Sequence, residues 1–139
     1  MSSGTAKPRK TVSRRSSLGK VQVIAFAATA NPARAEAFYR DTLGLKLMSE
    51  DGFALVFDAN GTMLRVQRVQ QVMISPYTSL GWAVPDIGAT VKQLLANGVV
   101  FERYDGMAQD ELGIWTSPAG AKIAWFKEPE GNTFSLTEF

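Results

Sequence analysis

The sequence predicts an α+β fold in which two tandem βαβββ modules form a U-shaped, mixed-sheet cleft. Three observations predict it. A strand–helix pattern occurs twice, the hydrophobic period changes from about 3.6 to about 2 after each helix, and a glycine follows each helix. We assign module one to residues 21–69, a linker to 70–77 and module two to 78–139. Together they form one domain, residues 21–139, which a tail of residues 1–20 precedes.

One amphipathic helix is predicted in each module. In the first, Asn31 is a suitable N-cap and Pro32 occupies the first helical position, where proline is favoured. In the second, Asp86 is the N-cap. Gly44 and Gly98 follow the last helical residues, where a left-handed C-terminal cap belongs. The helices therefore end at equivalent points of a repeated unit.

Each helix is preceded by one strand and followed by three. In module one the expected strands are Val21–Thr29, Leu45–Glu50, Phe53–Asp58 and Thr62–Val69. In module two they are Ser79–Val84, Val99–Arg103, Lys122–Lys127 and Thr133–Glu138. The dipeptide Asn60-Gly61 favours a tight hairpin between the last two strands of module one.

Composition excludes several chemistries. The 139 residues contain neither Cys nor His. Disulfides, thiolate metal sites and cysteine nucleophiles are therefore excluded, and the side chain most often used as a general base near neutral pH is missing. No apolar run approaches the roughly 20 residues of a membrane-spanning helix. We expect a cytoplasmic protein that does not bind membranes.

The basic character of the chain lies in its tail. Residues 1–20 carry six basic residues and no acid, which leaves residues 21–139 with 9 basic and 13 acidic residues. We interpret the tail as a disordered, solubilising extension. The alternatives are a nucleic-acid arm, an organelle transit peptide and a phosphorylation site at Arg14-Arg15-Ser16-Ser17. Because the tail has no aromatic residue to stack on bases, we expect no nucleic-acid partner.

Three segments resemble parts of the vicinal oxygen chelate superfamily, which includes glyoxalase I, bleomycin-resistance proteins and extradiol dioxygenases. The segment FYRDTLGL, residues 38–45, is similar to the one that closes the family's first helix. The segment WFKEPEGN, residues 125–132, is similar to its FKDPDGN turn, with both Asp replaced by Glu, and VPDI, residues 84–87, resembles its second helix start. The resemblance spans residues 21–139. Its paired modules, and the need to cover short sheet edges, predict a homodimer.

The resemblance also implies four metal-ligand positions. The family's two His fall on Ile24 and Ser79, and its two Glu fall on Arg65 and Ser135. Catalytic metals prefer imidazole, thiolate or carboxylate ligands, and an arginine would repel a cation. We therefore expect a member of this family that holds no metal and no cofactor.

Strand alternation places those four positions on the cleft face. The candidate ligand-binding residues are Arg65, Gln67, Gln22, Ser79, Ser135 and Phe26 from the strands, with Tyr104 and Trp115 from a loop. This lining suits a small ligand with an anionic or carbonyl end. The alternative is that these side chains only fill or hydrate the cleft and Arg65 extends to solvent. Trp82 and Trp125 have the opposite parity, so we assign both to the helix-packed core.

The loop Tyr104–Ala121 has two interpretations. It folds over the cleft as a lid, or Ile114 and Trp115 form an extra strand packed on the core. Its acidic residues are Asp105, Asp110 and Glu111. Without a nearby His or Lys we expect them to be solvated rather than catalytic.

Three functions fit these features. We favour metal-independent binding of a small organic molecule in the cleft, as in bleomycin-resistance proteins, with no catalytic residue. One alternative is a metal-free isomerase or lyase that acts on a carbonyl compound through loop carboxylates and Tyr104. The other is a regulatory or interaction subunit with a vestigial cleft. The polar lining favours the first, because a vestigial cleft would fill with apolar side chains.

Overall fold

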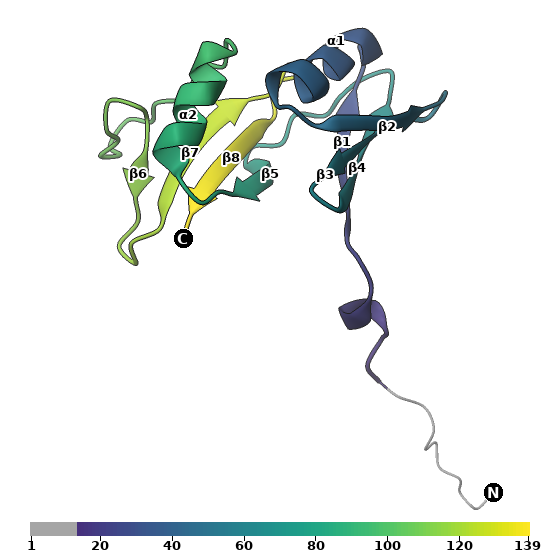
Figure 1. Ribbon diagram of the computed structural model, residues 1–139, viewed down its shortest axis with the longest axis horizontal. Coiled ribbons are helices and arrows are strands. Elements are labelled where there is room, and N and C mark those ends of the chain that lie inside the picture. The colour runs from purple at the N-terminus through teal and green to yellow at the C-terminus, as the bar shows by residue number, and fades with distance from the viewer. Residues whose placement is uncertain (1–13) are drawn as a thin grey trace, which may run out of the picture.

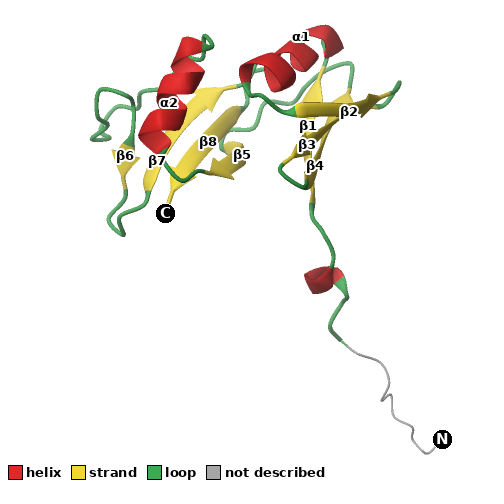
Figure 2. Ribbon diagram, viewed as in Figure 1, coloured by secondary structure: helices red, strands yellow, loops and turns green. Residues whose placement is uncertain are grey.

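The computed structural model describes residues 14–139, which form two four-stranded mixed sheets, each with a helical segment packed on one face (Figures 1 and 2). The first sheet has the strand order β1-β4-β3-β2 and the second the order β5-β8-β7-β6. In each sheet the first strand runs parallel to the last, and the other neighbours are antiparallel. The predicted α+β class with two tandem βαβββ modules is confirmed.

Most element boundaries lie close to the expected ones. The first module contains β1 (Ile24–Thr29), α1 (Pro32–Glu36), η3 (Ala37–Thr42), β2 (Lys46–Glu50), β3 (Ala54–Ala59) and β4 (Thr62–Arg68). The second contains β5 (Thr78–Ala83), α2 (Ile87–Ala96), β6 (Trp115–Thr116), β7 (Lys122–Lys127) and β8 (Thr133–Glu138). Asn60 and Gly61 both have positive φ, as the expected tight hairpin requires.

Both helices begin and end where the sequence predicts. The side chain of Asn31 accepts a hydrogen bond from the Arg34 N–H, and Asp86 caps the second helix in the same way. Gly44 has a φ of 79° and Gly98 a φ of 92°, which is the left-handed cap conformation.

The first helix changes type before it ends. Its second half, η3, is a π-helix, in which the Leu43 N–H donates to the Phe38 carbonyl oxygen five residues earlier, at 2.9 Å. The distance along the chain from N-cap to glycine is 13 residues in the first module and 12 in the second. The π turn therefore accommodates one extra residue.

A single hydrophobic core lies between the two modules. The buried Tyr39 ring of η3 is 5.4 Å from Phe57 in the first sheet and 6.2 Å from Phe134 in the second. The helical segment of module one thus packs on both sheets. The Tyr39 hydroxyl has no hydrogen-bond partner among the described residues. Burial, together with the charges of Glu128 and Glu130, raises the pKa of Tyr39 far above its ordinary value.

A carboxylate joins the modules at the end of β1. Glu130, in the turn between β7 and β8, accepts hydrogen bonds from the Thr29 hydroxyl at 2.8 Å and from the Ala30 N–H at 3.1 Å. The Arg34 guanidinium lies 3.0 Å from the same oxygen. We call this group the Glu130 clasp. It fixes the end of the first strand of module one against the last turn of module two.

Module two departs from the prediction after its helix. Residues 99–103 form no strand, and within them Phe101 makes one isolated bridge to Phe126. The strand that pairs with β7 is instead the two-residue β6, where Trp115 is opposite Ile123. The loop Tyr104–Ala121 was expected to be either a lid or an extra strand. The structure has the extra strand, and Ile114 beside it is buried in the core.

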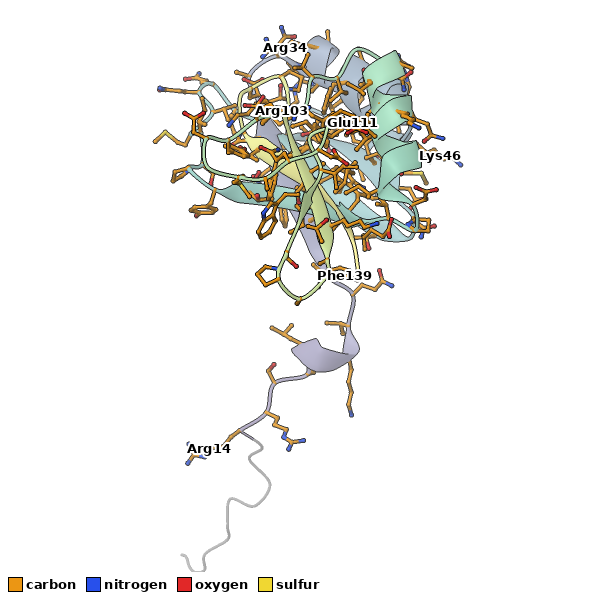
Figure 3. The ribbon with its side chains drawn as sticks, turned by 90° about the vertical axis from the view of Figure 1, so that its left-hand side faces the viewer. Arg14, Arg34, Lys46, Arg103, Glu111 and Phe139 are labelled. Atoms are coloured by element: carbon orange, nitrogen blue, oxygen red, sulfur yellow. The ribbon has the colours of Figure 1, made fainter. Side chains whose placement is uncertain are left out.

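The described part of the tail runs away from the sheets, and Arg14 lies far from them (Figures 1 and 3). Within it, Leu18–Lys20 form one 3₁₀ turn whose residues are exposed. The predicted disorder of residues 1–13 concerns a stretch outside the described residues. From Arg14 to Phe139, the longest helices are too short to cross a membrane.

Candidate functional site

A cavity of about 230 Å³ lies at the junction of the two modules. It is lined by β1, β4, the linker, β5, β8 and the turn between β7 and β8: Phe26, Ala27, Ala28, Gln67, Val72, Met73, Ser75, Ser79, Glu128, Asn132 and Phe134. Three of the predicted ligand-binding residues, Phe26, Gln67 and Ser79, meet there. We call this space the junction cavity. Its volume is below the range typical of sites for drug-sized ligands, so it suits a small molecule.

The face of the first sheet opposite its helix carries the cavity's apolar edge. The parallel pairing of β1 with β4 places Phe26 beside Arg65, and Ile24 beside Met63, on this helix-free face. Ile24, Phe26 and Met63 are between 42% and 52% exposed. Large apolar side chains therefore surround Arg65 on an open surface.

The side chain of Arg65 is half-buried, and its guanidinium has neither a hydrogen bond nor an ion pair with any residue in the described part of the chain. It lies next to Phe26 across the sheet and two residues from Gln67 on the same strand face. The neighbouring Arg68, in contrast, donates to the Asp51 carbonyl oxygen at 3.0 Å. The guanidinium of Arg65 is thus available to a ligand oxygen.

The positive charge of Arg65 acts on the carboxylate of Asp51. Its carboxylate accepts hydrogen bonds from the backbone N–H groups of Phe53 and Ala54, at 2.8 and 3.0 Å. These bonds hold the pKa of Asp51 below its ordinary value, and the positive charges of Arg65 and Arg68 lower it further. Asp51 is therefore ionised at neutral pH and already bonded to backbone groups.

Glu128 is the acid of the junction cavity. It is 4% exposed, and its carboxylate accepts a hydrogen bond from the Asn132 N–H. Burial raises the pKa of Glu128 above its ordinary value, although the amides of the turn partly oppose this effect.

The linker is tied to the same turn. The Asn132 side chain accepts a hydrogen bond from the Ser75 N–H at 2.7 Å, which fixes the linker wall of the cavity. Ser79 donates from its hydroxyl to the Thr133 carbonyl oxygen at 3.4 Å. Ser75, Asn132 and Glu128 are site residues that were not predicted from the sequence. The EPEGN turn could be recognised in the sequence, but its position next to the linker could not, because that position depends on tertiary packing.

On the second sheet, three aromatic rings cover the helix-free face. Trp125 makes an edge contact with Tyr104 at 5.5 Å and a tilted one with Trp115 at 6.2 Å. The assignment of Trp125 to the helix-packed core is wrong. In β7 its neighbours Ala124 and Phe126 are buried on the helix side, so alternation turns Trp125 to the other face. The assignment of Trp82 holds, since its ring packs on Phe134 at 5.7 Å.

This aromatic cover separates several predicted site residues from the junction cavity. Tyr104 and Trp115 lie together within it, and Ser135, opposite Trp125 in the register, is only 9% exposed. Gln22 precedes β1 and is exposed, so strand alternation does not assign its side chain to the cleft face. The chain thus brings together Phe26, Gln67 and Ser79, keeps Arg65 beside them, and places the others elsewhere.

The loop after residue 103 is held by its own polar side chains. Arg103 donates to the carbonyl oxygens of Asp110 and Glu111, and Figure 3 shows Arg103 and Glu111 on the same side of the molecule. The Asp110 carboxylate accepts from the Leu112 and Ile114 N–H groups, both at 2.9 Å. Asp110 is therefore committed to the loop backbone. This arrangement gives no support to acid–base catalysis by that carboxylate.

The residues present do not fit the divalent metal that the family resemblance implies. Between Arg14 and Phe139, no three His, Cys, Asp or Glu side chains gather as a metal site would require. At the four implied positions stand an aliphatic side chain, a guanidinium and two hydroxyls. The Ser79 hydroxyl is bonded to a backbone carbonyl. This donor set lacks the charge and the nitrogen or sulfur ligands that such ions need.

Similar folds occur among solved structures. A member of the glyoxalase/bleomycin resistance protein/dioxygenase superfamily from Sphaerobacter thermophilus is 20% identical, with a TM-score of 0.64 over 86% of this chain and 98% of that one. A lactoylglutathione lyase from Agrobacterium tumefaciens is 17% identical, with a TM-score of 0.67 over 86% and 93%. A glyoxalase family protein from Enterococcus faecalis is 20% identical, with a TM-score of 0.63 over 84% and 94%. No protein-family model and no curated protein matches the sequence.

Proposed function

We propose that this chain, which has the vicinal oxygen chelate fold of the glyoxalase/bleomycin resistance/dioxygenase superfamily, binds a small organic anion without a metal. The observation that carries the proposal is the half-buried, unpaired guanidinium of Arg65 beside the exposed Phe26 ring. The apolar part of the ligand packs on Phe26 in the junction cavity, and its carboxylate bonds to Arg65.

The chemistry of the two groups supports this division of roles. A guanidinium presents a planar fork of N–H donors that matches a carboxylate. A charge-assisted hydrogen bond of this kind contributes about 1.5–3 kcal/mol. Phe26 and the aliphatic neighbours of Arg65 supply apolar area, and Gln67 adds an amide for a carbonyl or hydroxyl of the ligand. No group of this set is placed to act on a bond of the ligand, so binding alone is the function proposed.

A second copy of the chain is part of the proposal. The helix-free face of the first sheet exposes Ile24, Phe26 and Met63 next to each other, and such a patch is unusual on a monomer's open surface. We propose that the protein is a homodimer in which a second copy covers part of this face and narrows the access to Arg65.

The test is a comparison of small aromatic and aliphatic acids with their amides, by thermal shift and calorimetric titration. Arg65→Met is expected to weaken binding of the acids about 10- to 100-fold, which corresponds to the loss of one charge-assisted contact. The amides should bind weakly to both proteins. Arg68→Met removes the same charge from the same strand and is expected to leave binding unchanged.

Chelator treatment supplies the remaining control and should alter neither the melting temperature nor the affinity. The proposal is overturned if Arg65→Met binds every acid as tightly as the unmodified protein. It is equally overturned if binding requires an added divalent ion.

A further inference from the structure

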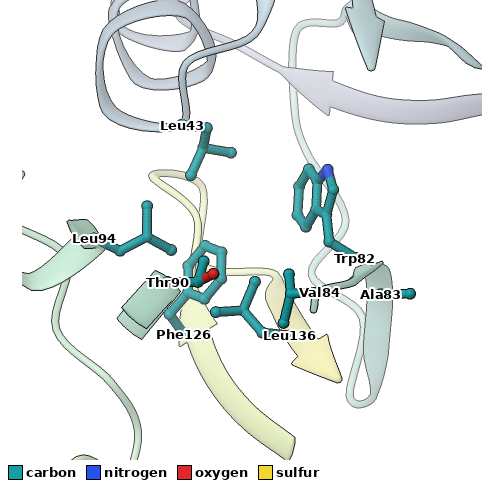
Figure 4. A pocket seen from close by; sticks show the side chains of 8 residues that line it. All are labelled: Leu43, Trp82, Ala83, Val84, Thr90, Leu94, Phe126 and Leu136. Carbon is teal, nitrogen blue, oxygen red and sulfur yellow. The ribbon is translucent and has the colours of Figure 1, made fainter. Parts of the chain in front are cut away.

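A second cavity, of about 140 Å³, lies on the helix side of the second sheet, away from Arg65 and the junction cavity. Eight residues line it: Leu43, Trp82, Ala83, Val84, Thr90, Leu94, Phe126 and Leu136 (Figure 4). They come from the end of the first module's helix, from α2 and from β5, β7 and β8. We call this space the helix-side cavity.

We propose that the helix-side cavity is a binding site for a small, uncharged aromatic hydrocarbon or an aryl group of that size. This inference is independent of the function proposed for Arg65. It rests on the volume of the cavity, the chemistry of its walls and the way its roof is fixed.

The walls are mainly apolar, and the indole N–H of Trp82 is the polar side-chain group that they leave to a ligand within the described residues. Thr90 is the one lining residue with a hydroxyl, and this hydroxyl donates to the Asp86 carbonyl oxygen at 3.1 Å. The Val84 N–H likewise donates to the Thr137 carbonyl oxygen at 2.8 Å. A water molecule needs two to four polar partners to be stable in such a space. The walls therefore favour an apolar ligand, and the face of an aromatic ring can also accept the Trp82 N–H.

The size selects among apolar occupants. An engineered cavity of about 150 Å³ lined by aliphatic and aromatic side chains stays dry and binds benzene. The helix-side cavity is open to solvent on one side but has a comparable volume, and Figure 4 shows the Trp82 and Phe126 rings on different sides of it. Aromatic walls make edge and offset contacts with a ring that they cannot make with a branched alkane. A single six-membered ring is therefore the preferred occupant.

The roof of the cavity is held in place across the modules. Leu43 stands at the end of η3, and the carbonyl oxygen of the preceding residue, Thr42, accepts a hydrogen bond from the Asn97 side chain at 3.1 Å. Asn97 is the C-cap of α2, whose Leu94 and Thr90 form the opposite wall. Because this bond joins roof and wall, the space is preformed and a ligand does not have to open it.

The experiment uses toluene as the probe and the methyl NMR signals of the full-length protein as the readout. Toluene is expected to shift the methyl signals of Leu43, Leu94 and Leu136 in a saturable manner and to raise the melting temperature. Thr90→Leu, which extends a side chain into the cavity, should weaken toluene binding at least tenfold. Gln93→Leu makes a similar change on the exposed side of α2 and should bind toluene as the unmodified protein does.

Two results would overturn the inference. One is a titration of the unmodified protein in which no methyl signal saturates, or in which the saturating signals lie outside the helix-side cavity. The other is a folded Thr90→Leu variant that binds toluene with unchanged affinity. If Thr90→Leu fails to fold, the titration of the unmodified protein decides alone. Arg65→Met should bind toluene normally, so failure of this inference and failure of the Arg65 proposal are distinguishable.

Discussion

Removing the Glu130 clasp with Glu130→Ala is expected to destabilise the protein by about 1–4 kcal/mol. Thr29 is 1% exposed, and its hydroxyl donates to the carboxylate. The variant leaves this buried donor without its acceptor, which costs about 1–3 kcal/mol. The ion pair with Arg34, whose side chain is 49% exposed, adds about 0–1 kcal/mol. The Ala30 N–H is in an exposed contact and can bond to water, so it adds little.

The stability lost in Glu130→Ala should be larger at neutral pH than in acid. Burial alone would raise the pKa of Glu130, but the bonds from Thr29 and Ala30 and the charge of Arg34 outweigh it and hold the pKa below its ordinary value. A lowered pKa stabilises the fold above the ordinary glutamate pKa of about 4.3, and this contribution is lost as the pH falls through the folded-state value. The difference between the proteins should therefore be full at pH 7 and shrink in acid.

Urea unfolding at pH 7 and at pH 3.5, followed by circular dichroism, measures both quantities. Arg34→Met should cost less than about 1 kcal/mol, because it removes only the partly exposed ion pair. Glu50→Ala, at an exposed position, should change the stability by less than about 0.5 kcal/mol. A loss below about 0.5 kcal/mol for Glu130→Ala would refute the view that the clasp stabilises the junction.

Two further measurements concern the junction and the assembly. Burial raises the pKa of Glu128, so the protonated side chain favours folding below the ordinary glutamate pKa, and this contribution is lost as the pH rises through the folded-state pKa. The melting temperature of Glu128→Gln, relative to that of the unmodified protein, is therefore expected to increase from pH 4 to pH 8. A difference in melting temperature that does not change with pH would contradict this. Sedimentation equilibrium should give twice the chain mass of 15.1 kDa, and Ile24→Glu should give a monomer; a monomeric unmodified protein would remove the dimer from the proposal.

Local signals in the sequence were sufficient for much of this architecture. Asn31, Asp86 and the two cap glycines act through backbone geometry within a few residues, so their roles could be predicted without tertiary information. The same holds for the Asn60-Gly61 hairpin and for the parity of Phe26 and Arg65.

The remaining features depend on tertiary contacts that leave no periodic pattern. The strand expected at residues 99–103 has the right composition, but β7 pairs at that edge with Trp115 instead. Trp125 was given the parity opposite to Ser135, whereas the register pairs the two residues on one face, where the loop provides Tyr104 and Trp115 to cover the Trp125 ring. The contact of Asn132 with Ser75 of the linker joins positions 57 residues apart in the chain.

The π turn at the end of the first helix bears on the difference in length between the two helical segments. An inserted residue in a regular α-helix would rotate everything after it by about 100° and turn Tyr39 or Leu43 off the core. Here the wider turn takes up the additional residue between Asn31 and Gly44, and Tyr39 stays buried in the core. The one-residue difference between the two helical segments is thus absorbed inside a helix rather than in a loop, whereas the greater length of the second module lies in the segment after its helix.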